Sequence, residues 1–154
     1  LHTNGYTLAR KILFQDLKLK FTDRPPGFSQ SLQTTLLKPH RCYLKEIQAL
    51  QKKIQIKGMA HITGGGLIEN IARILPPKTN ALINKSSWQP PAIFYFLKQS
   101  GKLSENEAYR VFNMGIGFVV IISVKNAAKM LKLTKGYYLG EIRRGEGKVL
   151  LNYT

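Results

Sequence analysis

Three consecutive glycines constrain this fold more than any other stretch of the sequence. Gly64, Gly65 and Gly66 lie within the segment from Gly58 to Asn70, between a short apolar run and a helical pattern. Glycine has no Cβ, so the backbone N–H groups of such a turn can approach a ligand closely. The helix that follows adds unpaired N–H groups and a partial positive charge, which suit a phosphate. Spacing alone leaves two interpretations open, an anion cradle or a tight strand-to-helix turn, because the Walker and Rossmann patterns are incomplete.

Hydrophobic periodicity predicts a layered domain of about five strands and five or six helices. The chain has 154 residues, 44% of them hydrophobic, which is enough for one ordinary core. Helices are expected at 5–15, from Pro39 onward with this proline in the first turn, at 67–75, at 92–100, after the capping box at Ser104 and at 125–133. Strands are expected at 56–62, 81–83, the second half of 112–122, 137–142 and 149–153, and residues 16–35 are expected to be a loop. Thr3 or Asn4 is expected to cap the first helix, and 143–147 to form a hairpin-like turn. This order predicts an α+β (or α/β layered) fold, a mixed sheet packed with helices.

Charge and cysteine usage limit the classes of function. Lysine and arginine number 24 against eight acidic residues, a net charge of +16, which can indicate nucleic-acid binding. The basic residues are dispersed, however, and aromatic residues are not interleaved with them, so solvated lysine faces that favour an anionic substrate explain the charge more simply. Cys42 is the single cysteine and is expected to be structural; it excludes an internal disulfide and suits a reducing compartment. The three histidines are too dispersed for a familiar metal-ligand spacing, so no metal site is expected.

No segment is expected to cross a membrane or to direct secretion. Apolar runs fall well short of the ~20 residues that a spanning helix needs. Arg10 and Lys11 interrupt the first apolar segment, which predicts a cytoplasmic protein. The chain begins at Leu1 and enters a helical pattern almost at once, as if it were cut at a domain boundary.

Several motifs together resemble one enzyme family along essentially the whole chain. The specific signatures are His-Ile-Thr-Gly-Gly-Gly at 61–66 and Phe-Asn-Met-Gly-Ile-Gly at 112–117. Supporting matches lie at 2–10, 36–39 with Tyr43, 58–70, 86–88, 109–117 and 140–142. In these residues the chain resembles the C-terminal half of the aminoimidazole ribonucleotide (AIR) synthetase family, the phosphoribosylformylglycinamidine cyclo-ligases.

The resemblance implies a ligase of purine biosynthesis. Such enzymes use ATP and Mg²⁺ to cyclise formylglycinamidine ribonucleotide (FGAM) to AIR, and they are homodimers built mainly through an N-terminal domain. That domain supplies most nucleotide and magnesium ligands, and its motifs are absent from this sequence. The resemblance therefore implies that residues 1–154 are the C-terminal domain alone, inactive without its own N-terminal ATP-binding domain.

Site residues follow from the positions that match the family motifs. His61 is the candidate catalytic residue, as a substrate contact or as a proton shuttle during ring closure. The candidates for binding substrate or phosphate are Thr63, Gly64, Gly65, Gly66, Glu69, Asn70, His2, Asn4, Arg110 and Asn113. Glu69 also has a sufficient structural role, because a carboxylate in the first turn favours the helix dipole.

Three alternatives stay open. One is another ATP-dependent member of the superfamily, of the formylglycinamidine synthase, thiamine-phosphate kinase, selenophosphate synthetase or hydrogenase-maturation type. The second is a basic nucleic-acid-binding module, whose binding would fall steeply with salt. The third is a purely structural domain in which the glycines only turn the chain.

Overall fold

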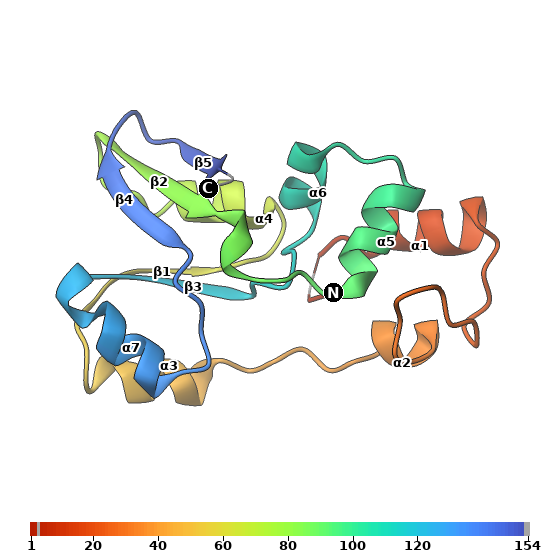
Figure 1. Ribbon diagram of the computed structural model, residues 1–154, viewed down its shortest axis with the longest axis horizontal. Coiled ribbons are helices and arrows are strands. Elements are labelled where there is room, and N and C mark those ends of the chain that lie inside the picture. The colour runs from red at the N-terminus through yellow and green to blue at the C-terminus, as the bar shows by residue number, and fades with distance from the viewer. Residues whose placement is uncertain (3, 153–154) are drawn as a thin grey trace.

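The structure, a computed structural model, describes residues 1–2 and 4–152 (Figure 1). The first helix, α1 (Tyr6–Arg10), continues directly as a π-helical segment, η1 (Lys11–Asp16), close to the predicted range. The predicted cap is wrong for Asn4, because Gly5 is the N-cap residue and, among the residues that the structure describes, no side chain caps the helix. The Asn4 amide nitrogen instead donates to the Val111 carbonyl at 2.5 Å, which ties the N-terminal segment to a distant helix. Thr3, the other predicted cap, lies outside the described residues.

The region after η1 differs most from the sequence expectation. Helix α2 (Leu32–Leu36) forms inside the predicted loop, and the Ser31 hydroxyl caps it by accepting from the Thr34 N–H. Helix α3 (Leu44–Gln51) begins well after Pro39, so the prediction that this proline lies in the first turn is wrong. A proline disfavours the α conformation in the residue before it. Residues 37–43 consequently form an extended connector between α2 and α3 (Figure 1), and Cys42 on this connector is exposed.

The five predicted strands and the α+β class are confirmed, but the strands form two sheets. Strand β1 (Ile56–His61) pairs antiparallel with β3 (Phe118–Ile122), with His61 opposite Phe118. In the second sheet β2 (Thr79–Asn84) lies between β4 (Gly140–Arg144), which is antiparallel to it, and β5 (Val149–Asn152), which is parallel.

The expected hairpin-like turn at 143–147 is wrong, because β4 and β5 lie on opposite sides of β2. The Asn80 side-chain oxygen accepts from the N–H groups of Glu146 and Lys148, both at 2.8 Å. These two bonds attach the segment between β4 and β5 to the start of β2. The chain thereby crosses from one side of the central strand to the other before β5 begins.

The remaining helices follow their local sequence signals. Helix α4 (Gly66–Ala72) begins at the third glycine, and α5 (Ala92–Ser100) matches its predicted range. Ser104 is the N-cap residue of α6 (Glu105–Val111), and its hydroxyl accepts from the Glu107 N–H. Short 3₁₀ turns, η2 (Lys85–Ser87) and η3 (Val124–Asn126), precede α5 and α7 (Ala127–Leu133). In Figure 1 the strands gather at the left, α3 and α7 lie together below them, and α1, α2 and α5 lie at the right.

One hydrophobic core joins α1, α2, α4, α5 and α6 to the strands. Its fully buried members include Ile62, Leu67, Leu97 and Phe112, which come from four different segments. Trp88 belongs to this core, and its Nε1 donates to the Met114 carbonyl at 2.9 Å. The core thereby fixes the end of β1, the start of α4 and the end of α6 against one another. Within the described residues, no helix is both long and apolar enough to cross a bilayer.

Candidate functional site

The glycine turn is a specific backbone structure. The Gly66 N–H donates to the Thr63 carbonyl at 3.0 Å and closes a four-residue turn. Gly65, at φ 91° and ψ −7°, has the conformation of the third residue of a type II turn, which favours glycine. Gly66 also has a positive φ, 58°. The sequence thus places three glycines where the chain must reverse between β1 and α4.

The three glycines have different surroundings. A Cβ on Gly66 would overlap the Tyr109 carbonyl oxygen and lie 3.0 Å from the Phe112 carbonyl oxygen, so Gly66 lets α6 pack directly on the turn. A Cβ on Gly64 would meet no atom within 4 Å. Gly66 is therefore required by the fold, whereas Gly64 faces open space where a ligand could approach.

The Asn70 side chain stabilises the glycine turn from the protein interior. It is buried, and its Nδ2 donates to the carbonyls of Gly66 at 2.8 Å and Gly64 at 3.0 Å. Among the described residues, the N–H groups of Gly64 and Gly65 donate to no protein acceptor. Two backbone donors of the turn are consequently free for an anion, which is the property expected of a phosphate cradle.

Glu69 and Arg110 lie together beside this turn. The Glu69 carboxylate is 3.0 Å from Arg110 Nε and 3.7 Å from an Arg73 guanidinium nitrogen. All three side chains are substantially exposed, so these ion pairs contribute little stability, on the order of 1 kcal/mol or less. They do place two guanidinium groups close to the start of α4.

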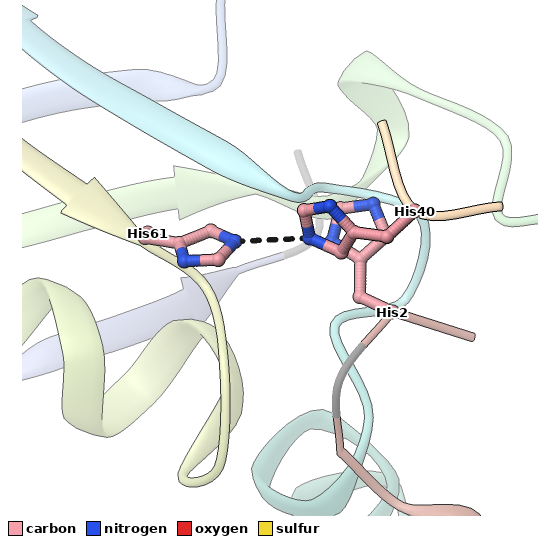
Figure 2. Close-up of side chains that lie close together, drawn as sticks. All are labelled: His2, His40 and His61. Atoms are coloured by element: carbon pink, nitrogen blue, oxygen red, sulfur yellow. Dashed lines mark hydrogen bonds between the residues drawn. The ribbon is translucent and has the colours of Figure 1, made fainter. Parts of the chain in front are cut away.

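Three imidazole rings meet at the end of β1, next to the glycine turn. His61 is the last residue of β1, His40 lies on the connector before α3, and His2 lies near the start of the chain (Figure 2). The Nε2 atoms of His40 and His61 are 3.2 Å apart, and the ring centroids of His2 and His40 are 4.3 Å apart. One ring nitrogen from each histidine lies within 4.8 Å of the other two. The three histidines are far apart in the sequence, so their spacing did not predict the cluster that they form in the folded chain.

His2 is the most buried of the three. Burial, and then the nearby His40, lower the pKa of His2 to about 4, so its ring is neutral at pH 7. Its Nε2 lies 3.1 Å from the Tyr43 hydroxyl, and burial likewise raises the pKa of Tyr43. A Cβ on Gly117 would overlap both side chains, so this glycine lets the two rings pack against the backbone at the start of β3.

The other two predicted residues hold this region in place. The buried Asn113 side chain accepts from the Gly115 N–H at 3.1 Å and so shapes the turn after α6. Asn4 joins the N-terminal segment to the end of α6, as described above. The structure thus brings His2 to His61, and Glu69 to Arg110, while Asn4, Asn70 and Asn113 make contacts within the protein.

A largely apolar hollow of about 870 Å³ lies beside the histidines. Residues of β3, β4, α3 and α7 line it, and it reaches Tyr43, Gly117 and Phe118, which surround the His2 ring and the end of β1. Its size is typical of a small-molecule site. The three glycines of the turn are not among the residues that line it.

The fold and the sequence define the class of protein. A solved structure of thiamine-monophosphate kinase from Stenotrophomonas maltophilia matches 98% of this chain and 48% of its own, with a TM-score of 0.63 and 14% identity, which shows a shared fold. The sequence profile of the AIR synthase related protein, C-terminal domain family matches residues 1–150. The chain belongs to this family, as its motifs indicate.

Individual relatives carry a more specific name. Proteins named phosphoribosylformylglycinamidine cyclo-ligase are 46% identical in Caldanaerobacter subterraneus, over 98% of this chain, and 45% identical in Geotalea uraniireducens, over 95%. The aligned region is 46% and 43% of those two proteins. The chain therefore spans about half the length of these relatives.

Sequence reasoning missed His40 as a member of the site. No local signal marks it, because the preceding Pro39 predicts only where a helix begins. The contact with His61 depends on the path of the connector from 37 to 43, which places residues 21 positions apart side by side.

Proposed function

We propose that this chain is the C-terminal domain of an ATP-dependent cyclo-ligase, which closes the imidazole ring of FGAM to give AIR in the cytoplasm. The observation that carries this proposal is the identity of about 45% with proteins of that name along nearly the whole chain. The domain works together with an N-terminal domain that supplies most of the ATP and Mg²⁺ ligands, in a homodimer. The chain alone has no cyclo-ligase activity.

The reaction demands positioning and stabilisation of negative charge. ATP transfers its γ-phosphoryl group to the formyl oxygen of FGAM and leaves as ADP. The nitrogen that enters the ring then attacks the formyl carbon and loses a proton, and inorganic phosphate departs. Charge develops on phosphoryl oxygens, so oriented backbone donors are effective catalysts.

The glycine turn is the anion-binding part of this domain. Its support is the pair of free N–H groups at Gly64 and Gly65, the open space above Gly64, and the guanidinium group of Arg110 nearby. Thr63 adds a hydroxyl at the same turn. Asn70 acts as a positioning residue, because its amide nitrogen fixes the turn carbonyls.

His61 is the residue proposed to accept the proton that the attacking nitrogen loses. Its ring is exposed at the end of β1, two residues before the turn, so it can reach a substrate whose phosphate lies on the glycines. His40 lies against it, with the two Nε2 atoms 3.2 Å apart, and the exposed His61 ring can pass the proton directly to solvent. General-base catalysis of this kind is worth roughly 10²–10⁴-fold in rate.

A fusion protein tests the proposal. The N-terminal half of the Caldanaerobacter relative is joined to Leu1 of this chain, and AIR formation from FGAM and ATP is measured. We expect turnover from the fusion and none from the 154-residue chain. His61→Ala in the fusion should lower kcat by about 100-fold or more.

A matched variant separates chemistry from folding. Met59→Ala changes another exposed side chain on β1, two residues earlier, and should leave kcat unchanged. Normal turnover by the His61→Ala fusion would remove the catalytic role of His61. A folded fusion that phosphorylates thiamine monophosphate and makes no AIR would favour the kinase alternative.

A further inference from the structure

We propose that His2, His40 and His61 form a binding site for one four-coordinate transition-metal dication, with Zn²⁺ as the first choice. This inference rests on the geometry of the cluster and goes beyond the proposed cyclo-ligase function, whose Mg²⁺ accompanies ATP. An imidazole has a single lone pair, so His61 cannot bind a metal ion and accept a proton at the same time. Metal binding and proton acceptance by His61 are therefore alternative states of the site, and a bound Zn²⁺ should inhibit ring closure.

The spacing of the ring nitrogens fits a shared metal ion. Two nitrogens bound to one tetrahedral Zn²⁺ at about 2.1 Å lie roughly 3.4 Å from each other. The Nε2 atoms of His40 and His61 are already 3.2 Å apart. The three ligand nitrogens all lie within 4.8 Å of one another. A small rotation of the side chains would therefore bring all three to bonding distance from one ion.

The protein builds this cluster from three separate segments. His2 packs on Gly117, where a side chain would overlap its ring, and the Tyr43 hydroxyl holds its Nε2 at 3.1 Å. The Nδ1 atom of His2 is buried and has no hydrogen-bond partner among the described residues. Leaving a buried polar atom without a partner costs free energy. The unpartnered ring nitrogen of His2 therefore favours a ligand at this site.

The ligand chemistry selects the class of metal. Imidazole nitrogens suit Zn²⁺, Co²⁺, Ni²⁺ or Cu²⁺, whereas Mg²⁺ and Ca²⁺ prefer oxygen ligands. Among the described residues, no carboxylate or thiolate belongs to the cluster. The site is consequently distinct in chemistry from a site for the magnesium of ATP.

The surroundings leave room for an ion and for a fourth ligand. His40 and His61 are exposed, so an ion can enter from solvent and keep an open position for water or an anionic oxygen. The nearby positive charge of Arg41 is paired with Glu46 at 2.5 Å, which reduces its repulsion of a dication.

Direct metal titration tests the site. The untagged chain is stripped with a chelator and titrated with ZnCl₂ by calorimetry and with CoCl₂ by visible absorption, which reports tetrahedral coordination. We expect one equivalent of metal to bind, and binding at least tenfold weaker in His40→Ala and in His61→Ala. Both side chains are exposed, so the variants should fold; His40→Gln and His61→Gln are parallel variants that keep a polar side chain.

Cys42→Ser is the matched control. Cys42 is an exposed potential ligand two residues from His40 but lies outside the cluster, so this variant should bind metal like the parent. The proposal is wrong if the parent binds no metal, if both histidine variants bind as tightly as the parent, or if only Cys42→Ser loses binding. The titration needs neither ATP nor a second domain, so its failure and a failure of the cyclo-ligase proposal are distinguishable.

Discussion

Adding one methyl group to Gly66 or to Gly64 should have opposite consequences for this protein. A Cβ at position 66 would overlap the Tyr109 carbonyl oxygen and lie 2.8 Å from the carbonyl carbon of the same residue. These atoms belong to the backbone of α6 and cannot rotate away. At position 64 the added Cβ would meet no atom within 4 Å.

The structure gives the size of the expected effect. Gly66 has φ 58°, a left-handed conformation that costs an L-residue about 1–2 kcal/mol. Overpacking against a fixed backbone adds about 1–3 kcal/mol. Gly66→Ala should thus lower the free energy of unfolding by about 3 kcal/mol, equivalent to about 6–12 °C in Tm for a domain of this size. Gly64→Ala should change it by less than about 1 kcal/mol.

Thermal and urea unfolding of the chain, followed by circular dichroism, measures both variants. A Gly66→Ala protein that melts within 2 °C of the parent, on the order of 1 kcal/mol, would refute the close packing of α6 on the turn. A loss of several degrees in Gly64→Ala would equally contradict the open space above that residue. If Gly64→Ala keeps stability but lowers turnover in the fusion, the glycine serves a ligand.

Three further changes test the site. Asn70→Ala removes the buried amide that bonds the turn carbonyls and should cost about 1–3 kcal/mol in urea unfolding; an unchanged midpoint would mean that the turn does not depend on it. Gly117→Ala should displace His2 and Tyr43, whose side chains can move, and weaken Zn²⁺ binding about tenfold or more, with only a small change in Tm; unchanged calorimetric binding would contradict the packing. Zn²⁺ at 100 times its Kd should stabilise the chain by about 2.7 kcal/mol, raising Tm by roughly 5–11 °C, and the same rise in His61→Ala would contradict the assigned ligand.

Helices whose ends are set by nearby capping, proline or glycine residues were predictable from the sequence. Helix α6 begins after its capping Ser104, and α5 lies between a proline pair and Gly101, as their patterns indicate. Helix α2 is only five residues long, too short for a periodic signal, and it was missed. The place of β5 beside β2 depends on Asn80 bonds to residues more than 60 positions away, which no local pattern reveals.

In the candidate site, too, features set by local sequence were predictable, and features set by distant segments were not. The sequence from His61 to Asn70 is continuous, so its strand, turn and helix were predictable together, and the relatives share its family. That Gly66 serves packing while Gly64 faces open space depends on α6, which is 40 residues away. The approach of His40 to His61 depends on the connector path and was visible only in three dimensions.

The stoichiometry of the reaction decides whether this domain takes part in ring closure. The fusion of this chain to the N-terminal half of the Caldanaerobacter relative is supplied with FGAM and ATP, and AIR, ADP and phosphate are measured together. We expect the three products to appear in equal amounts with the parent sequence and all three to fall together in His61→Ala. ATP hydrolysis without AIR formation, by a fusion that is folded, would contradict this expectation.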